Sequence, residues 1–187
     1  MSFPVYVDPI PLPAALTSGS GVQTYTDPLG DLWVAANGVY AGAWRRPREV
    51  LHCMYIRNAA FNMATSWTNF GYNAVNTDNY SLYNPGTGVF TPPIAGMWQL
   101  TTSIAALTSA TTTQYIQTRW LVGGTAWGTT FMIGYGASGI QLVVGPSAMP
   151  IYLNAGQQAT SQFASNAALT GVANQTTYMA IDFLGTT

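Results

Sequence analysis

The sequence predicts an all-β domain built as a sandwich or jelly roll. Alternation of inward apolar and outward polar residues, typical of strands with one buried face, runs through residues 98–106, 116–122 and 177–183. Turn-forming residues separate the apolar segments, as at Asn84-Pro85-Gly86 and Gly145-Pro146. No stretch has the 3.6-residue periodicity and capping residues of an amphipathic helix. Many short strands joined by such turns are typical of sandwiches and jelly rolls.

Charged residues make up only 6% of the chain, against about 25% in an average soluble domain. After Asn58 only Asp78, Arg119 and Asp182 carry a full charge. No run of roughly 18 apolar residues is present, so we expect no membrane insertion. The N-terminus also lacks the charge and apolar run of a signal peptide. A net charge of −1 offers no basic stripe, so we expect no nucleic-acid binding. A neutral polar surface, partly covered in an oligomer, fits this composition.

Residues 1–30 and 31–54 are expected to lie outside the main domain. The first segment holds five of the eleven prolines, which predicts an extended Pro-rich arm that either crosses a neighbouring subunit or is disordered. The second segment predicts a small β-hairpin turning at Asn37-Gly38. An isolated hairpin is marginally stable in water, so this module should dock on something. We therefore interpret it as an attachment module.

Four of the five arginines fall within thirteen residues of the sequence. Guanidinium groups pair with carboxylates in a bidentate manner, so this cluster is a candidate docking surface for an acidic partner. The alternative is a solvated turn in which Arg46 or Arg48 pairs with Glu49. The candidate docking residues are Trp33, Trp44, Arg45, Arg46, Arg48 and Arg57.

The segment YNPGTGVFTPPIAGMWQL, residues 83–100, resembles the signature of the complement globular-head domain, whose fold is shared with tumour necrosis factor. Residues 59–63, 151–163 and 176–187 resemble other strands of that family in the same order. The resemblance covers about residues 55–187. Its signature and core positions here are Phe61, Tyr83, Gly88, Phe90, Pro93, Gly96, Trp98, Leu153, Gly156 and Phe183.

This resemblance implies a ten-stranded jelly roll over residues 55–187 that packs as a homotrimer around an apolar axis. Two features depart from the family pattern: Met97-Trp98 replaces a bulky residue followed by Tyr, and residues 108–114 form a Thr-rich loop. Some related heads bind calcium, and a site made of backbone carbonyls and one Asp stays an alternative. We expect no cofactor and no metal.

Residues 30–51, GDLWVAANGVYAGAWRRPREVL, resemble short segments of minor tail proteins from phages that infect actinobacteria. The two resemblances together predict a bacteriophage virion protein, a minor tail or tail-fibre-type trimer. It would attach to other virion proteins through its N-terminal region and display the jelly-roll head, after assembly in the host bacterial cytoplasm. The alternatives are a capsid decoration trimer or a head that binds a host-surface glycan.

The sequence predicts no catalytic activity. His52 and Cys53 are neighbours in an expected strand, so their side chains point to opposite faces and cannot form a dyad. Residues 50 and 54, which share the face of His52, offer no carboxylate to orient it. Asp78 lies in a polar turn, where it is expected to bond nearby backbone, and Asp182 alternates outward from the last strand.

Aromatic residues on the expected loops are candidate glycan contacts, because aromatic rings stack on sugars. Packing in the core or at a trimer interface is the alternative. The candidates are Trp67, Tyr72, Trp127 and Tyr135, with Phe70 beside them.

Overall fold

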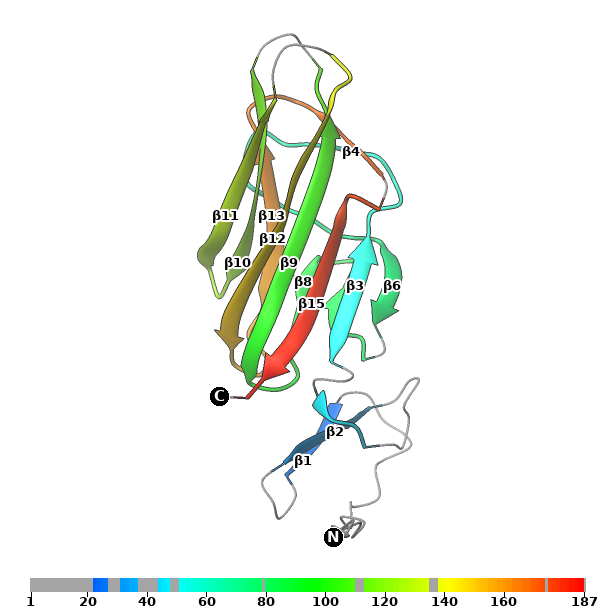
Figure 1. The fold of residues 1–187 in the computed structure, drawn as a ribbon, viewed down its shortest axis with the longest axis vertical. Helices are drawn as coiled ribbons and strands as arrows, with labels where there is room; N and C mark the ends of the chain where they lie inside the picture. Colours follow the sequence, from blue (N-terminus) through cyan, green and yellow to red (C-terminus); the bar gives the residue numbers. More distant parts are fainter. Residues whose placement is uncertain are drawn as a thin grey trace, which may run out of the picture.

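The computed structural model describes residues 22–26, 31–36, 44–47, 51–78, 80–109, 113–134, 138–173 and 175–186. Two β-sheets lie face to face as a sandwich, and a two-stranded sheet lies at one end of it (Figure 1). The all-β prediction is confirmed by the element order. Within the described ranges, no helix has the length and hydropathy that a membrane crossing requires.

The front sheet takes its name from its position toward the viewer in Figure 1, where β12, β9, β15, β3 and β6 run side by side. Strand β9 is its centre and pairs antiparallel with β12 on one side and β15 on the other. The strands of the front sheet are β3 (His52–Ile56), β4 (Phe61–Asn62), β6 (Ala74–Asp78), β9 (Gly96–Leu107), β12 (Gln141–Leu153), β14 (Thr170–Gly171) and β15 (Tyr178–Gly185).

The back sheet lies behind it, in the order β11-β10-β13-β8-β7, and β5 also pairs with β13. Strand β11 forms one edge of this sheet, because its only strand partner in the topology is β10. The strands of the back sheet are β5 (Thr68–Asn69), β7 (Tyr83–Asn84), β8 (Val89–Phe90), β10 (Gln114–Val122), β11 (Thr125–Gly134) and β13 (Ala159–Ser165).

The core lies between the sheets and follows the predicted alternation. Trp98 and Leu100 of β9 and Ile116 and Trp120 of β10 are all 0% exposed. Phe183 of β15 packs against Trp98 with ring centroids 4.9 Å apart. Burying a large apolar side chain contributes about 1.5–3 kcal/mol, so these positions make the two sheets one folding unit.

The turn predicted at Thr87-Gly88 is confirmed. The side-chain oxygen of Asn84 accepts hydrogen bonds from the amides of Gly86 and Thr87, and its carbonyl accepts one from the Gly88 amide at 2.8 Å. Gly88 has a φ of 72°, which residues with a Cβ rarely adopt. Here the Asn and the Gly of the signature therefore fix a turn.

Gly96 is required by close packing. A Cβ at this position would lie 2.6 Å from the carbonyl oxygen of Gly185 and from the Phe183 ring. The glycine therefore lets the start of β9 approach the end of β15. Among the other signature positions, Tyr83, Phe90 and Leu153 are buried.

Three signature residues lie at the margins of the core. Phe61 is partly buried and packs on Phe70, with ring centroids 4.6 Å apart. Pro93 is half-buried after the end of β8. Gly156, with a φ of 78°, occupies the turn after β12, and its amide donates to the carbonyl of Pro92 at 2.9 Å.

The jelly roll begins three residues earlier than predicted. Strand β3 starts at His52 and pairs with β15 inside the front sheet, so residues 52–54 belong to the sandwich and not to the attachment module. The expected opening strand at residues 59–63 is reduced to the two-residue β4. The resemblance placed the opening strand of the jelly roll too late. The alternation of buried and exposed residues in β3 begins at His52, inside the segment that the prediction assigns to the hairpin.

The hairpin also pairs differently from the prediction. Strand β1 (Val22–Thr26) pairs antiparallel with β2 (Leu32–Ala36), a partner that the prediction did not include. Part of the expected arm is therefore a strand. Turn residues 37–40 lie outside the described residues, and Arg45 pairs with Val34 through its backbone on the other side of β2.

Candidate functional site

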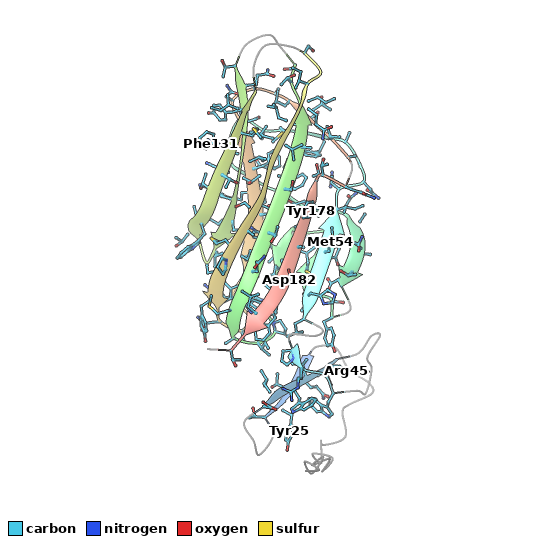
Figure 2. All side chains as sticks on the ribbon, in the orientation of Figure 1. Tyr25, Arg45, Met54, Phe131, Tyr178 and Asp182 are labelled. Atoms are coloured by element: carbon cyan, nitrogen blue, oxygen red, sulfur yellow. The ribbon has the colours of Figure 1, made fainter. Side chains whose placement is uncertain are left out.

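The predicted docking cluster is partly assembled next to β2. The Arg46 guanidinium lies 5.1 Å from the centroid of the Trp33 ring and forms a salt bridge with Asp31 at 3.0 Å. The Trp44 ring lies 6.0 Å from that of Tyr25. These contacts bring the two tryptophans and Arg46 into one small module, whose labelled residues Tyr25 and Arg45 lie below the sandwich in Figure 2. Arg48 lies outside the described residues.

Asp31 is an ion-pair partner of this cluster, because Arg46 pairs with it at the entry to β2. The alternative to a docking role, pairing of Arg46 or Arg48 with Glu49, falls on Glu49, which lies outside the described residues. The salt bridge is about half exposed, with side-chain exposures of 52% and 43%, so its own contribution to stability is small. Arg45 is exposed, and its backbone bonds to Val34 hold it in place.

Arg57 does not belong to the docking cluster. It follows β3 in the sandwich, where its guanidinium donates to the carbonyl oxygens of Ala59 and Gly71 at 3.2 and 3.0 Å. The same group lies over the rings of Phe61 and Phe70, 5.8 and 5.7 Å from their centroids. Its role is to join loop segments of the jelly roll, which proximity in sequence to the other arginines could not reveal.

Tyr72 is a core residue, so its assignment as a glycan contact is wrong. Its side chain is 0% exposed. Its hydroxyl forms a hydrogen bond with the Thr102 hydroxyl of the front sheet and lies 3.5 Å from the Ser161 hydroxyl of the back sheet. Burial raises the pKa of Tyr72 well above its usual value. Phe70 is likewise buried, and Tyr135 lies outside the described residues.

The remaining aromatic candidates are accessible. Trp127 on β11 is 45% exposed. Trp67 is half-buried and stacks on the Arg119 guanidinium, whose central carbon lies 4.0 Å from the ring centroid. These two tryptophans therefore lie on the molecular surface, where the sequence analysis placed them.

Strand β11 exposes apolar side chains on both of its faces. Phe131 is 65% exposed, and Met132 and Ile133 are 42% and 46% exposed. Beside it, Trp127 and Tyr152 help to line a groove of about 550 Å³ between β11 and β12. Isolated apolar residues on a surface need no explanation, but a contiguous patch marks an interaction site. The sequence signal was the run TAWGTTFMIG, in which the alternation of polar and apolar residues is lost.

The outward face of the front sheet is almost free of charge. Figure 2 shows Met54, Tyr178 and Asp182 on this face, and Phe131 on the edge strand of the back sheet. Asp182 and His52 are register partners on neighbouring strands. The carboxylate that the sequence analysis did not find near His52 therefore lies across the sheet, on the next strand, and not along β3.

The two acidic side chains of the sandwich have different surroundings. Burial raises the pKa of Asp182, and the nearby His52 partly opposes the shift. Asp78 accepts hydrogen bonds from the amides of Leu82 and Tyr83 and from the Tyr55 hydroxyl, the last at 2.8 Å. The prediction that Asp78 bonds nearby backbone is thus confirmed.

The cysteine beside His52 is enclosed in the core. Cys53 is 1% exposed while its neighbour His52 points outward, so the two side chains lie on opposite faces of β3 as predicted. Burial raises the pKa of the Cys53 thiol well above its usual value, which keeps it in the unreactive thiol form. Across the described ranges, no three His, Cys, Asp or Glu side chains gather closely enough to hold a metal ion.

We expect Asp182→Asn to raise the melting temperature at neutral pH. A carboxyl whose pKa rises on folding binds more protons in the native state, so wild-type stability falls as pH rises from about 3.9 through the raised native pKa. Asn carries no charge at any of these pH values. The difference in melting temperature should therefore be near zero at about pH 3 and grow toward about pH 7. Thermal denaturation monitored by circular dichroism measures it.

Asp78→Asn is the matched control, because it removes a similar charge from a carboxylate that is held by three donors. It should lower the melting temperature at neutral pH. A melting temperature of Asp182→Asn below that of the wild type at neutral pH would mean that attraction to His52 outweighs the cost of burial, and would contradict this account.

The comparisons with known proteins concern the fold. No protein-family model matches the chain, and no curated protein has significant sequence similarity to it. The globular domain of zebrafish complement 1qA protein aligns with a TM-score of 0.51 at 11% identity, over 73% of this chain and 98% of that domain. Eiger TNF from S. frugiperda aligns with a TM-score of 0.55 at 10% identity, over 73% and 93%. Murine APRIL aligns with a TM-score of 0.50 at 11% identity, over 71% and 98%.

These similarities confirm the predicted fold class, although in the described residues the sandwich has the thirteen strands β3 to β15 and not the ten that were predicted. The sandwich of β3–β15 is a jelly roll of the complement globular-head and tumour-necrosis-factor type. At identities of 10% and 11%, they establish the architecture alone.

Proposed function

We propose that this chain is a non-enzymatic, homotrimeric building block of a bacteriophage virion, of the minor tail or tail-fibre type. The N-terminal module attaches it to other virion proteins, and the jelly roll is displayed as a head. The observation that carries the assembly part of this proposal is the apolar edge strand β11 on a chain with few charges. The phage context is supported by the resemblance of residues 30–51 to minor tail proteins.

Two surfaces of the jelly roll suit contact between subunits. Strand β11 presents Phe131, Met132 and Ile133 to solvent. The front sheet presents small or apolar side chains such as Ala180 and Met54. Along β3 and β15, His52 and Asp182 are the only base and carboxylic acid. A contact of the β11 edge with the front sheet of the next copy is heterologous, and it closes into a ring when repeated by threefold rotation.

A homotrimer explains the composition better than a monomer does. Charged side chains on a surface discourage self-association, and this chain has very few of them after residue 58. Exposed strand edges template pairing with another chain unless charges or prolines protect them. The described part of β11 contains neither a charged residue nor a proline. Covering this edge with a neighbouring subunit removes the exposed apolar surface.

The hairpin module supports the attachment role. Val34 of β2 is 0% exposed and belongs to the hydrophobic core, and Leu32 packs against that core, so the module is docked on the jelly roll. It carries the exposed side chains of Arg45 and Arg46. A small docked module with a cationic surface is suited to binding an acidic partner in the particle.

Removal of residues 1–48 is expected to abolish incorporation into virions while the jelly roll still folds, because the deletion ends before β3. Phage carrying the truncated gene would be purified and probed for the head by immunoblotting. The matched control is the full-length double variant Arg45→Gln with Arg46→Gln, which keeps the hairpin and should reduce incorporation less. Unchanged incorporation of the truncated chain would contradict the attachment role.

Two alternatives keep the trimeric jelly roll but change its place. A capsid decoration trimer would be present in hundreds of copies per particle, and a tail component in few, so quantitative gel analysis of virions separates them. A glycan-binding receptor-binding head is favoured by the half-buried Trp67 and the exposed Trp127, which are suited to stacking on sugars.

A further inference from the structure

Arg119 is held by a row of side chains that crosses three strands of the back sheet. Arg119 on β10 is the register partner of Gln162 on β13, and Gln162 is the partner of Asn69 on β5. The Arg119 Nε–H donates to the Gln162 side-chain oxygen at 2.8 Å. The Gln162 amide nitrogen donates to the Asn69 side-chain oxygen, also at 2.8 Å. Each member of the row is therefore oriented by the next one.

Trp67 fixes the plane of the same guanidinium. It stands two residues before Asn69, directly ahead of β5. The central guanidinium carbon lies 4.0 Å from the Trp67 ring centroid, a distance typical of a strong cation–π contact. The ring and the Nε–H bond together hold Arg119 in one orientation, so little side-chain entropy remains to be lost on binding.

The two terminal nitrogens of Arg119 remain available. Among the described residues, they donate to no acceptor, and the only salt bridge is that of Arg46 with Asp31. At the end of the row, the Asn69 side-chain oxygen accepts the hydrogen bond from Gln162. The Asn69 amide nitrogen has no acceptor in the described part of the chain. Arg119 is the single charged residue in the described strands of the back sheet. A fixed guanidinium with unused donors and no carboxylate partner is suited to binding an anion.

We propose that Arg119, Trp67 and Asn69 form a binding site for the carboxylate of an acidic saccharide. The guanidinium would take the carboxylate, and the Asn69 amide a neighbouring hydroxyl. On the same face of β10, Gln117 and Tyr115 are half-buried and continue the surface beyond Arg119. A single cation among amides and aromatic rings suits a ligand with one charge among several hydroxyls, whereas an acidic peptide would call for more cations.

The site does not depend on the proposed virion role. All of its residues come from one protomer and lie on β10, β13, β5 and the segment just before β5, whereas the proposed subunit contact uses the edge strand β11 and the front sheet. Sedimentation measures the oligomeric state separately, so a failed binding experiment and a failed trimer are distinguishable. The proposal also separates the two surface tryptophans, because Trp67 belongs to this site and Trp127 to the β11 edge.

The test is titration of the purified full-length protein with tetragalacturonate and with its fully methyl-esterified form, which has the same sugars without the charges. We expect the acid to bind. The ester should bind more weakly by about tenfold or by a larger factor. An NMR spectrum of the arginine Nε–H groups of the wild type should show the Arg119 signal shift on addition of the acid. This readout requires no variant to fold. Sialyllactose and oligomeric hyaluronate extend the test to other carboxylate sugars.

Variants then assign the site. Arg119→Gln and Asn69→Ala should weaken binding, the first by about tenfold or more. Arg119→Lys, which keeps the charge but loses the planar fork, should fall between Arg119→Gln and the wild type. Gln141→Ala, an exposed amide on the front sheet, is the matched control for Asn69→Ala and should bind normally.

Equal binding by Arg119→Gln, an unshifted Arg119 signal, or no binding of any acidic saccharide would overturn the proposal. Tighter binding of tetraglutamate than of the acidic sugars would show that the site prefers an acidic peptide. This result would contradict an acidic saccharide as the ligand.

Discussion

Trp98→Ala is expected to lower the free energy of unfolding by about 3–5 kcal/mol, which is a large part of the stability of an ordinary domain. Trp98 is 0% exposed and lies between Phe90 and Phe183, with ring centroids 5.1 and 4.9 Å away. Truncation leaves a cavity between the two sheets that neither sheet can close. Urea unfolding at one fixed protein concentration measures the loss, since an oligomer is also stabilised by its own concentration.

Trp98→Phe is the matched control for this cavity. Among the described residues, the indole nitrogen of Trp98 has no hydrogen-bond partner, so replacing the indole by a benzyl ring removes volume but breaks no such bond. We expect a loss clearly smaller than that of Trp98→Ala. Equal losses in the two variants would contradict the cavity as the cause.

Phe131→Asp is expected to convert the trimer into monomers at micromolar concentration. Phe131 is 65% exposed on β11, and in the proposed assembly a neighbouring subunit covers it. Burying an unpaired carboxylate there costs at least about 2 kcal/mol per contact, and a threefold ring contains three such contacts. Sedimentation velocity would show the change in mass, while circular dichroism should show an intact β fold.

Val75→Asp is the control for added charge on an exposed strand. Val75 is 62% exposed, which is close to the value for Phe131, and it lies on the edge strand β6, outside the surface of β3 and β15 that the proposed contact uses. The variant should remain trimeric. Dissociation of both variants would mean that added negative charge, and not the β11 contact, controls assembly.

Much of the fold could be predicted because strands carry their period in the local sequence. The alternation through Trp98, Leu100 and Ile104 identified the buried face of β9, and all three residues are 0% exposed. The turn at Gly88 was predictable for the same reason, since Asn84 and its neighbours determine it, whereas the requirement for glycine at position 96 comes from the distant Phe183 and Gly185. The alternation within β9 does not depend on which strands pair with it.

The hairpin shows where local patterns fail. Asn37-Gly38 predicts a return of the chain after β2, and the antiparallel bridge between Val34 and Arg45 agrees with it, but β2 also takes Val22–Thr26 as a partner on its other side. This extra strand, which the prediction assigned to the arm, depends on packing of the module, including the contact between the rings of Tyr25 and Trp44. That energy is tertiary and does not show in the turn motif.

The site residues were the least predictable part, because each site joins distant segments. Asp182 faces His52 across 130 positions of sequence, and Arg119 meets Trp67 and Gln162 only through the register of β10, β13 and β5. Tyr72 was misassigned because a polar loop surrounds it in sequence, while in space it lies between the sheets with its hydroxyl bonded to Thr102. Residue type alone could not separate a stacked surface tryptophan from a buried tyrosine.

The most direct test of the proposed function is the mass of the purified wild-type protein in solution. Sedimentation velocity at micromolar concentration should show one species of three times the 19.9 kDa chain mass. That species should persist on dilution, because the apolar surface of β11 is covered within it. A monodisperse monomer of 19.9 kDa under the same conditions would contradict the proposed assembly.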